Sequence, residues 1–469
     1  MSLKNVKKPK FRRSAPPPAY FLSLSVENAR CFGPAQELDL SDGKGGPARW
    51  TIILGDNGTG KTTLLQCLVA LQPTHVAIQD SMKVKPLATP AFNPNGMKLY
   101  RQLQRDVLSH DFFHRDIDIP THLRSTFSNS HSFSRVNNAL PKSSFSLKLR
   151  DHGYESEVNW SYSASDGYDF FFRSVFCAYG AGRKMGSSSL ANDELDNPVI
   201  SIFSDNSTLQ SADEWLLRAD YAARRATRNE GKAHDRLNSI KNVLVKILPD
   251  VDKINLSNPM HSADTPSVEF HTPYGWVTLD KLSLGYKTLI AWTVDLASWF
   301  FEKYPRHKNP LAQPAIVLVD EIDLHLHPKW QRNLVQYLSD LFPKTQFIVT
   351  AHSPLIVQAA QDANLAVLRR EKDHVVIDQS MKAVRGWRVD QVLSSDLFDI
   401  PSLRPPEFDD LLAERKRLLT KPKLTESDKT KLKKIDADLG NLPAGASIED
   451  SDAMQLIRRA AQNIKSSGE

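Results

Sequence analysis

The chain has 469 residues, of which 41% are hydrophobic and 24% charged, with a formal net charge of +6. This composition is ordinary for a globular protein of two or three lobes, and no apolar run approaches the ~20 residues of a membrane-spanning helix. Because the basic N-terminus lacks the apolar core of a signal peptide and three scattered cysteines exclude a disulfide framework, we expect a cytoplasmic protein.

The positive charge is concentrated at the start of the chain. Residues 1–13 hold six Lys or Arg and no acid, and without them basic and acidic residues balance at 54 each. Such a segment either contacts nucleic acid phosphates without sequence specificity or is a solvated end of the chain.

A phosphate-binding loop is predicted after a short apolar strand at residues 51–54. The sequence GDNGTGKT fits the GxxxxGKT pattern and leads into an apolar helical run. Its glycines let backbone N–H groups close around phosphate oxygens, while Lys61 reaches the β- and γ-phosphates and the Thr62 hydroxyl binds Mg²⁺. The expected nucleotide-binding residues are Asn57, Gly58, Thr59, Gly60, Lys61, Thr62 and Thr63.

Residues 80–175 show little periodicity and predict a loop-rich insertion. Within it, HDFFH at residues 110–114 resembles the HExxH zinc motif, but Asp replaces Glu and no further ligand is evident. An exposed helix turn is the favoured interpretation there. Two alternating runs separated by turn residues predict a hairpin over residues 146–162.

The next segment, residues 175–184, predicts a strand that runs into a small-residue turn with Arg183 and Lys184. This turn could face a nucleotide or a partner lobe, and a purely structural turn is favoured. Residues 209–248 have helical spacing of apolar residues. Their arginines, including Arg224, Arg225 and Arg228, could line a DNA-facing surface, although a solvated helix face is the default explanation.

Two later segments carry further candidate residues. LSLGYK at residues 282–287 precedes a hydrophobic helix, so its Ser and Gly form a second phosphate-competent helix start. The apolar run Ala315 to Val319 predicts a strand buried on both faces, ended by Asp320 and Glu321, and the strand Gln346 to Thr350 delivers His352. Ligands of open α/β sheets bind at such carboxyl ends.

In this order and spacing, the motifs resemble the ABC-type ATPase head of the SMC and RecF class. GDNGTGKT corresponds to Walker A, LSLGYK to the signature, VLVDE to Walker B, Asp323 to the D-loop and His352 to the switch histidine. The resemblance covers residues 20–70 and 275–360. It implies an α/β fold, a P-loop NTPase ABC-type head with a central mainly parallel sheet, an antiparallel β subdomain and a helical insertion lobe.

The resemblance also implies roles for the site residues. ATP and Mg²⁺ are the implied cofactors, with Thr62 and Asp320 holding the metal directly or through water. Glu321 would orient and deprotonate the attacking water, and His352 would contact the γ-phosphate. Two heads would sandwich two ATP molecules, so that Lys61 of one chain faces the signature of the other.

The signature residues implied to act in trans are Ser283, Gly285 and Lys287. The positions of Leu284 and Tyr286 depart from the LSGGQ consensus of transporters, as is usual in the SMC-like branch. The domain boundaries expected from the motifs are 1–18 for a flexible tail, 19–80 for the ATPase lobe with the P-loop, 81–175 for an insertion lobe, 176–274 for a helical lobe, 275–385 for the rest of the ATPase lobe and 386–469 for a C-terminal helical hairpin.

The narrower resemblance is to the PtuA ATPases of Septu antiphage systems and related retron effectors. It rests on the short SMC-like head without a coiled coil, the YGAGR turn, and a terminal hairpin of two helices broken at Pro422 and restarted by a Thr425-x-x-Asp428 cap. It implies a separate HNH nuclease that docks on a dimer or higher oligomer, with the hairpin as a possible contact. No nuclease site is predicted in this chain, because no clustered acidic metal motif follows His352.

Three functions remain open at this stage. The first is an ATPase that senses invading nucleic acid and controls a partner nuclease. The second is a RecF-like, DNA-binding repair ATPase that loads other proteins. The third is a scaffold that ATP stabilises with little hydrolysis.

Overall fold

The computed structural model describes residues 20–71, 121–128, 142–152, 155–162, 175–186, 198–204, 207–225, 230–257, 266–380, 384–398, 400, 409–419, 421 and 425–440. The chain divides into two compact units, Met1–Phe398 and Asp399–Glu469. Within the described residues, no helix is both long and apolar enough to cross a bilayer. The first unit holds all the predicted ATPase motifs.

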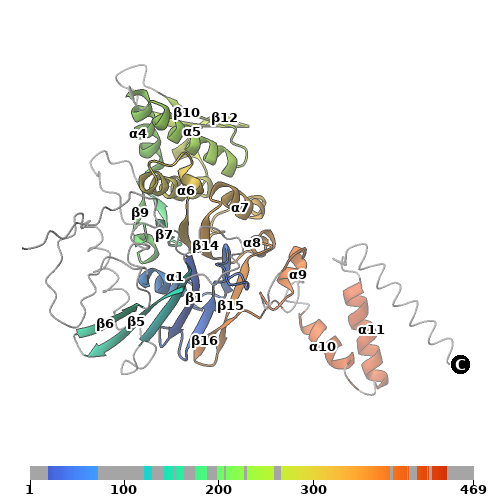
Figure 1. Cartoon of the computed structure of the whole chain (residues 1–469). Helices are drawn as coiled ribbons and strands as arrows, with labels where there is room; N and C mark the ends of the chain where they lie inside the picture. Colours follow the sequence, from blue (N-terminus) through green and yellow to red (C-terminus); the bar gives the residue numbers. More distant parts are fainter. Residues whose placement is uncertain are drawn as a thin grey trace, which may run out of the picture. The chain divides into compact units, whose positions relative to one another are not determined.

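The centre of the first unit is a six-stranded sheet in the order β16-β15-β3-β14-β13-β7 (Figure 1). Every neighbouring pair is parallel except β15 and β16. The strands are β3 (Trp50–Gly55), β7 (Val175–Tyr179), β13 (Ala315–Val319), β14 (Thr345–Thr350), β15 (Asn364–Glu371) and β16 (His374–Asp378). The sheet confirms the predicted α/β fold class.

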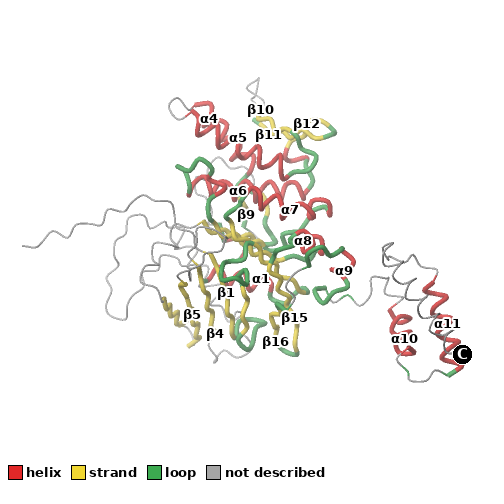
Figure 2. The backbone as a smooth tube through the Cα atoms, turned by 45° about the vertical axis from the view of Figure 1, so that its right-hand side comes forward, coloured by secondary structure: helices red, strands yellow, loops and turns green. Residues whose placement is uncertain are grey.

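Continuous apolar runs form these strands because both faces of the sheet are covered. Alternate side chains of β3 enter different clusters: Ile52 and Leu54 pack with α4 to α8, whereas Ile53 packs with α1 and the antiparallel sheet. Figure 2 shows α4 to α7 as one group beside the strands. The helices are α1 (Lys61–Ala70), α4 (Ala212–Arg225), α5 (Glu230–Ile247), α6 (Leu284–Lys303), α7 (Pro328–Leu341), α8 (Pro354–Ala359) and α9 (Val389–Leu393).

An antiparallel sheet in the order β2-β1-β4-β5-β6 forms the predicted β subdomain. The hairpin predicted at residues 146–162 is confirmed, because β5 and β6 pair antiparallel from Phe145–Tyr162 to His152–Glu155. The predicted alternation in β1 is also present, with Leu24 buried and Ser25 half-buried. The strands are β1 (Tyr20–Glu27), β2 (Gln36–Asp39), β4 (Thr121–Ser128), β5 (Lys142–His152) and β6 (Glu155–Tyr162).

In the part of the chain that the structure describes, two smaller sheets and three 3-10 helices accompany the main elements. β10 (Lys253–Ser257), β11 (Ser267–Thr272) and β12 (Gly275–Thr278) form an antiparallel sheet, and β8 (Lys184–Met185) pairs in parallel with β9 (Thr208–Leu209). The 3-10 helices are η2 (Ile200–Ile202), η3 (Leu279–Lys281) and η4 (Pro310–Ala312).

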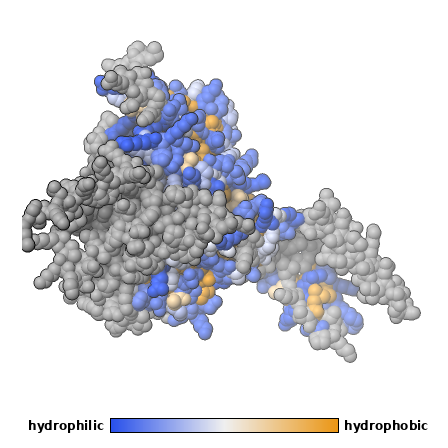
Figure 3. All heavy atoms as spheres, in the orientation of Figure 1, coloured by the Kyte–Doolittle hydropathy of each residue, from blue (hydrophilic) through white to orange (hydrophobic). Residues whose placement is uncertain are grey.

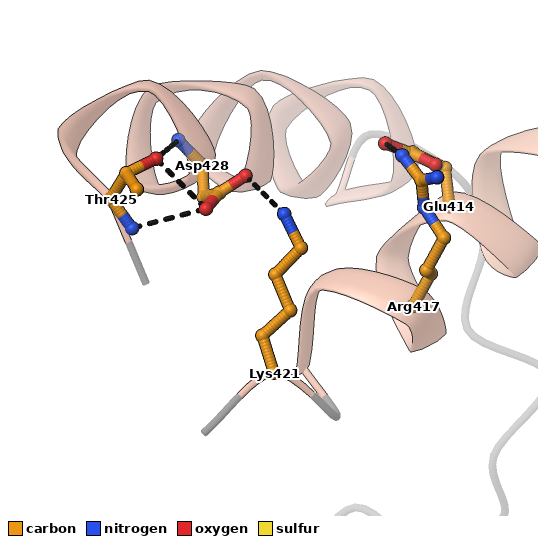
Figure 4. A network of polar contacts seen from close by, with 5 residues as sticks. All are labelled: Glu414, Arg417, Lys421, Thr425 and Asp428. Carbon is orange, nitrogen blue, oxygen red and sulfur yellow. Dashed lines mark hydrogen bonds and ion pairs between the residues drawn. The ribbon is translucent and has the colours of Figure 1, made fainter. Parts of the chain in front are cut away.

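The second unit contains the predicted helix pair, α10 (Asp409–Leu419) and α11 (Glu426–Gly440). The predicted cap is confirmed: the Asp428 N–H donates to Thr425 Oγ1 at 3.2 Å, and the Thr425 N–H donates back to Asp428 Oδ2 at 3.0 Å (Figure 4). A hydrogen bond from Lys421 lowers the pKa of the Asp428 carboxyl. These reciprocal bonds satisfy the N–H groups that a helix start leaves free.

Candidate functional site

The P-loop joins β3 to α1, and its glycines are required by geometry. Gly60 has a φ of 88°, and a Cβ there would lie 2.3 Å from the sulfur of Cys31. Gly60 also caps α1, and within the described residues no side-chain hydrogen bond caps the first turn. The start of α1 thus offers free donors and the positive helix end, which is what a phosphate needs.

Lys61 is buried at the floor of this loop. Its ammonium donates to the backbone oxygens of Gly55 at 2.7 Å and Asp56 at 2.8 Å. Burial lowers the pKa of Lys61, and the nearby carboxylates of Asp320 and Glu321 oppose that shift. An ammonium has three protons, so one remains for a phosphate oxygen while two hold the loop.

Asp320 joins Walker A and Walker B within one chain. Its Oδ2 accepts from the Thr62 hydroxyl at 2.6 Å, and its Oδ1 accepts from the Thr350 hydroxyl at 2.5 Å. Adjacent oxygen ligands of an octahedral Mg²⁺ lie about 2.9 Å apart, given metal–oxygen distances of about 2.05 Å. The Thr62 and Asp320 oxygens are therefore of the right type and nearly the right separation to hold Mg²⁺.

Glu321 follows Asp320 with its backbone in the left-handed region, at a φ of 46°. For a residue other than glycine this costs about 1–2 kcal/mol and persists only where neighbours hold it. Its N–H donates to Thr350 Oγ1 at 2.7 Å. Its half-buried carboxylate has no hydrogen-bond or ion-pair partner in the described part of the chain, so it is available to a water molecule.

Arg183 completes the support of Walker B, although the sequence favoured a purely structural turn here. Its guanidinium donates to the carbonyl oxygens of Gly180 at 2.9 Å, Asp320 at 2.6 Å and Glu321 at 2.9 Å. Only 4% of its surface is exposed, and burial lowers its pKa to about 10. The charge of Arg183 therefore lies directly behind the two acidic residues.

The loops after β13 and β14 are tied together. The Asp323 carboxylate accepts from the backbone N–H of His352 at 3.1 Å. The Gln331 amide donates to Leu326 O at 2.9 Å and accepts from the Ser353 hydroxyl at 2.7 Å. The exposed His352 ring has no hydrogen-bond partner among the described residues, so it is open to a ligand.

The signature residues lie at the start of α6. Ser283 is the exposed N-cap, but its hydroxyl makes no capping bond. Leu284 is 58% exposed, and a Cβ on Gly285 would lie 2.5 Å from His325 O, so the helix start abuts the D-loop. Lys287 Nζ donates to Asp280 O at 2.6 Å. No hydrogen bond joins Ser283 or Lys287 to the P-loop of the same chain in the described residues.

Two sequence-based alternatives have different outcomes. The HDFFH segment at residues 110–114 lies outside the described residues, and within the described ranges no group of three or more His, Cys, Asp or Glu could hold a metal ion.

The arginines considered for a DNA-facing surface lie in and after α4. There, Arg224 pairs with Asp220 at 2.7 Å, and Arg225 contacts Tyr221. Both arginines are thus engaged within their own helix, and Arg228 lies outside the described residues.

Comparisons with known proteins place these motifs in a family. A family model described as "AAA domain, putative AbiEii toxin, Type IV TA system" matches residues 51–358, and a model described as "AAA domain" matches residues 23–71. Among solved structures, an SMC head bound to the C-winged helix domain of ScpA covers 76% of this chain and 97% of its own chain, at 16% identity and a TM-score of 0.42.

Two curated relatives are similar in sequence. Septu protein PtuA of Bacillus mycoides (strain KBAB4) is 24% identical over 418 residues, covering 86% of this chain and 48% of that protein. Retron Ec83 probable ATPase of Escherichia coli is 38% identical over 156 residues, covering 32% of this chain and 27% of that protein. The matches thus span about half or less of these relatives' own length. Since the first family model covers well over half of this chain, the chain belongs to that AAA-domain family.

Proposed function

We propose that the chain hydrolyses ATP as a head-to-head dimer and, through that cycle, regulates a separate nuclease of HNH type in antiphage defence. The observation that carries the hydrolytic part is the junction of Thr62, Asp320 and Thr350, from which Glu321 projects with a carboxylate that has no partner in the described residues. Phosphoryl transfer needs mainly positioning and charge stabilisation, which this arrangement supplies.

Each residue has a defined task in this proposal. The first turn of α1 and the third proton of Lys61 bind the β- and γ-phosphates. Thr62 and Asp320 would hold Mg²⁺, which would supply positive charge to the phosphates. Glu321 orients the attacking water and accepts its proton, and His352 approaches the γ-phosphate from the next loop.

The exposed signature supports the proposed dimer. Ser283 and Leu284 are exposed at a helix start where the Ser283 side chain makes no capping hydrogen bond. A second protomer related by a two-fold axis could place its P-loop phosphates there, so that each ATP contacts both chains. Anion binding at a helix start is favourable, and it would bury Leu284.

Mixing two inactive variants tests this composite site. Lys61→Ala removes the P-loop cation and Ser283→Arg blocks the signature, so each alone should release little phosphate. In an equimolar mixture about half the dimers are mixed and each keeps one intact site, so about a quarter of the wild-type rate should return. Each variant alone at twice the concentration is the control. A mixture no more active than these controls contradicts the composite site.

The nuclease partner is proposed from the names of the relatives, which belong to Septu and retron systems. Co-expression with the product of the neighbouring gene should yield a complex in which nuclease activity on plasmid DNA changes when ATP is added. The mass of the complex and DNA cleavage with and without ATP are the measurements. A neighbouring product that never co-purifies, together with salt-sensitive DNA binding by this chain alone with ATP, would favour the RecF-like alternative.

The scaffold alternative makes a different prediction for the same preparation. If ATP only stabilises an assembly, the purified chain should bind ATP while steady-state phosphate release stays at background. The Glu321 carboxylate has no partner among the described residues and follows Asp320 directly, which favours hydrolysis instead.

A further inference from the structure

Arg183 is a buried cation whose hydrogen bonds, among the described residues, all go to backbone oxygens. Two of the three belong to the consecutive acids of Walker B, Asp320 and Glu321. A guanidinium is expensive to bury, and a stabilising role alone would be met more cheaply by an apolar side chain. The placement of its guanidinium at the end of β13 therefore indicates a role connected with those two acids.

The backbone around Glu321 is held from both sides. The Asp320 N–H donates to Tyr179 O at 2.8 Å, which is a backbone bond at the ends of β13 and β7. Beyond it, Thr350 accepts the Glu321 N–H, and Arg183 donates to the Glu321 carbonyl oxygen at 2.9 Å. With both peptide groups of Glu321 fixed, its left-handed conformation and the direction of its Cα–Cβ bond are fixed too.

The turn that carries Arg183 is itself rigid. The Arg183 N–H donates to Gly180 O, and a Cβ on Gly180 would lie only 2.0 Å from Ser201 O, so this turn packs directly on η2. The planar guanidinium spans three carbonyl oxygens at once, which a lysine ammonium cannot reproduce in the same geometry.

We propose that Arg183 is a positioning residue for hydrolysis, which holds the Asp320–Glu321 backbone so that the Glu321 carboxylate meets the attacking water. This rests on the proposed hydrolytic function. The proposal adds to that function, because it assigns a role to the turn after β7, and this turn lies outside the Walker and signature motifs. A displacement of about 1 Å in a catalytic group can cost ~100-fold in rate, so the effect of losing these bonds should appear in kcat.

The test compares Arg183→Gln and Arg183→Lys with Lys184→Gln, which removes the neighbouring exposed cation. Arg183→Gln should lower kcat ~10- to 100-fold while the ATP Kd stays within about threefold of wild type. The kcat of Arg183→Lys should lie between those of wild type and Arg183→Gln. The kcat of Lys184→Gln should equal that of wild type. If Arg183→Gln does not fold, Arg183→Lys decides alone: an unchanged kcat overturns the proposal.

A double-variant cycle separates positioning from general stabilisation. In a Glu321→Gln background, Arg183→Gln should change the residual single-turnover rate by less than about threefold, because its target is already absent. An equal loss of rate in both backgrounds, or a normal kcat with only a lower Tm, overturns the proposal. If wild type itself releases no phosphate, the proposed function fails instead, so the two failures are distinguishable.

Discussion

Replacing Lys61 with alanine is expected to raise the Kd for ATP by about 100-fold or more and to reduce phosphate release to background. The variant loses the cation for the β- and γ-phosphates, and truncating such a charged partner costs about 3 kcal/mol or more. It also leaves the carbonyl oxygens of Gly55 and Asp56 without the bonds that Lys61 now provides. The P-loop should therefore lose both its charge and part of its shape.

Titration with a fluorescent ATP analogue, in the presence of Mg²⁺, measures this effect. Lys44→Ala is the matched control, because Lys44 is an exposed lysine in the loop between β2 and β3 and carries no part of the site. The control should bind like wild type. A Lys61→Ala protein whose Kd stays within threefold of wild type would overturn the P-loop assignment.

Replacing Glu321 with glutamine should separate binding from turnover. The side chain keeps its size and the backbone bonds to Thr350 and Arg183 remain, so ATP and Mg²⁺ should still bind. The amide cannot accept the proton of the attacking water, and loss of a general base lowers rates by about 10²- to 10⁴-fold. We expect kcat to fall in that range with little change in the ATP Kd.

Steady-state phosphate release and ATP titration on the same preparation provide the two numbers. Glu302→Gln, at an exposed carboxylate near the end of α6, is the control for the change of charge and should be fully active. A Glu321→Gln protein with a near-normal kcat would show that another group activates the water.

The fold around the site was predictable where the signal is local. The apolar run at residues 315–319 specifies a buried strand, and the GxxxxGKT loop specifies a strand end and a helix start; both lie as predicted. The cap at Thr425 and Asp428 was predictable for the same reason, since its two partners lie three residues apart. Hydrophobic periodicity and short-range hydrogen bonding are visible in a single sequence.

The support of the site was not predictable, because it depends on distant parts of the chain. Arg183 donates to carbonyl oxygens of residues 137 and 138 positions away in the chain. Because every residue type has a backbone carbonyl, no sequence pattern predicts this contact. Thr350 likewise contacts distant residues, the Asp320 carboxylate and the Glu321 N–H, which lie 30 and 29 residues away. A weak signal did exist for Thr350, since a polar residue ends a buried strand beside the two acids, where the parallel strands meet.

Figure 3 shows a largely hydrophilic surface over the described part of the first unit in that view. Three large apolar side chains in the described part of the β11–β12 hairpin and α6 are about half exposed or more. They are Tyr274 and Trp276 of the hairpin and Leu284 of the signature. Leu284 is the one that the dimer proposal explains, because the partner's P-loop would cover it.

The central claim is that two chains complete each ATP site, and the mass of Glu321→Gln protein under saturating ATP tests it most directly. Because this variant should bind ATP without consuming it, light scattering should report at least twice the 52.7 kDa of one chain. Adding Ser283→Arg should return the mass toward that of a single chain. A Glu321→Gln protein with bound ATP and the mass of one chain would contradict the claim.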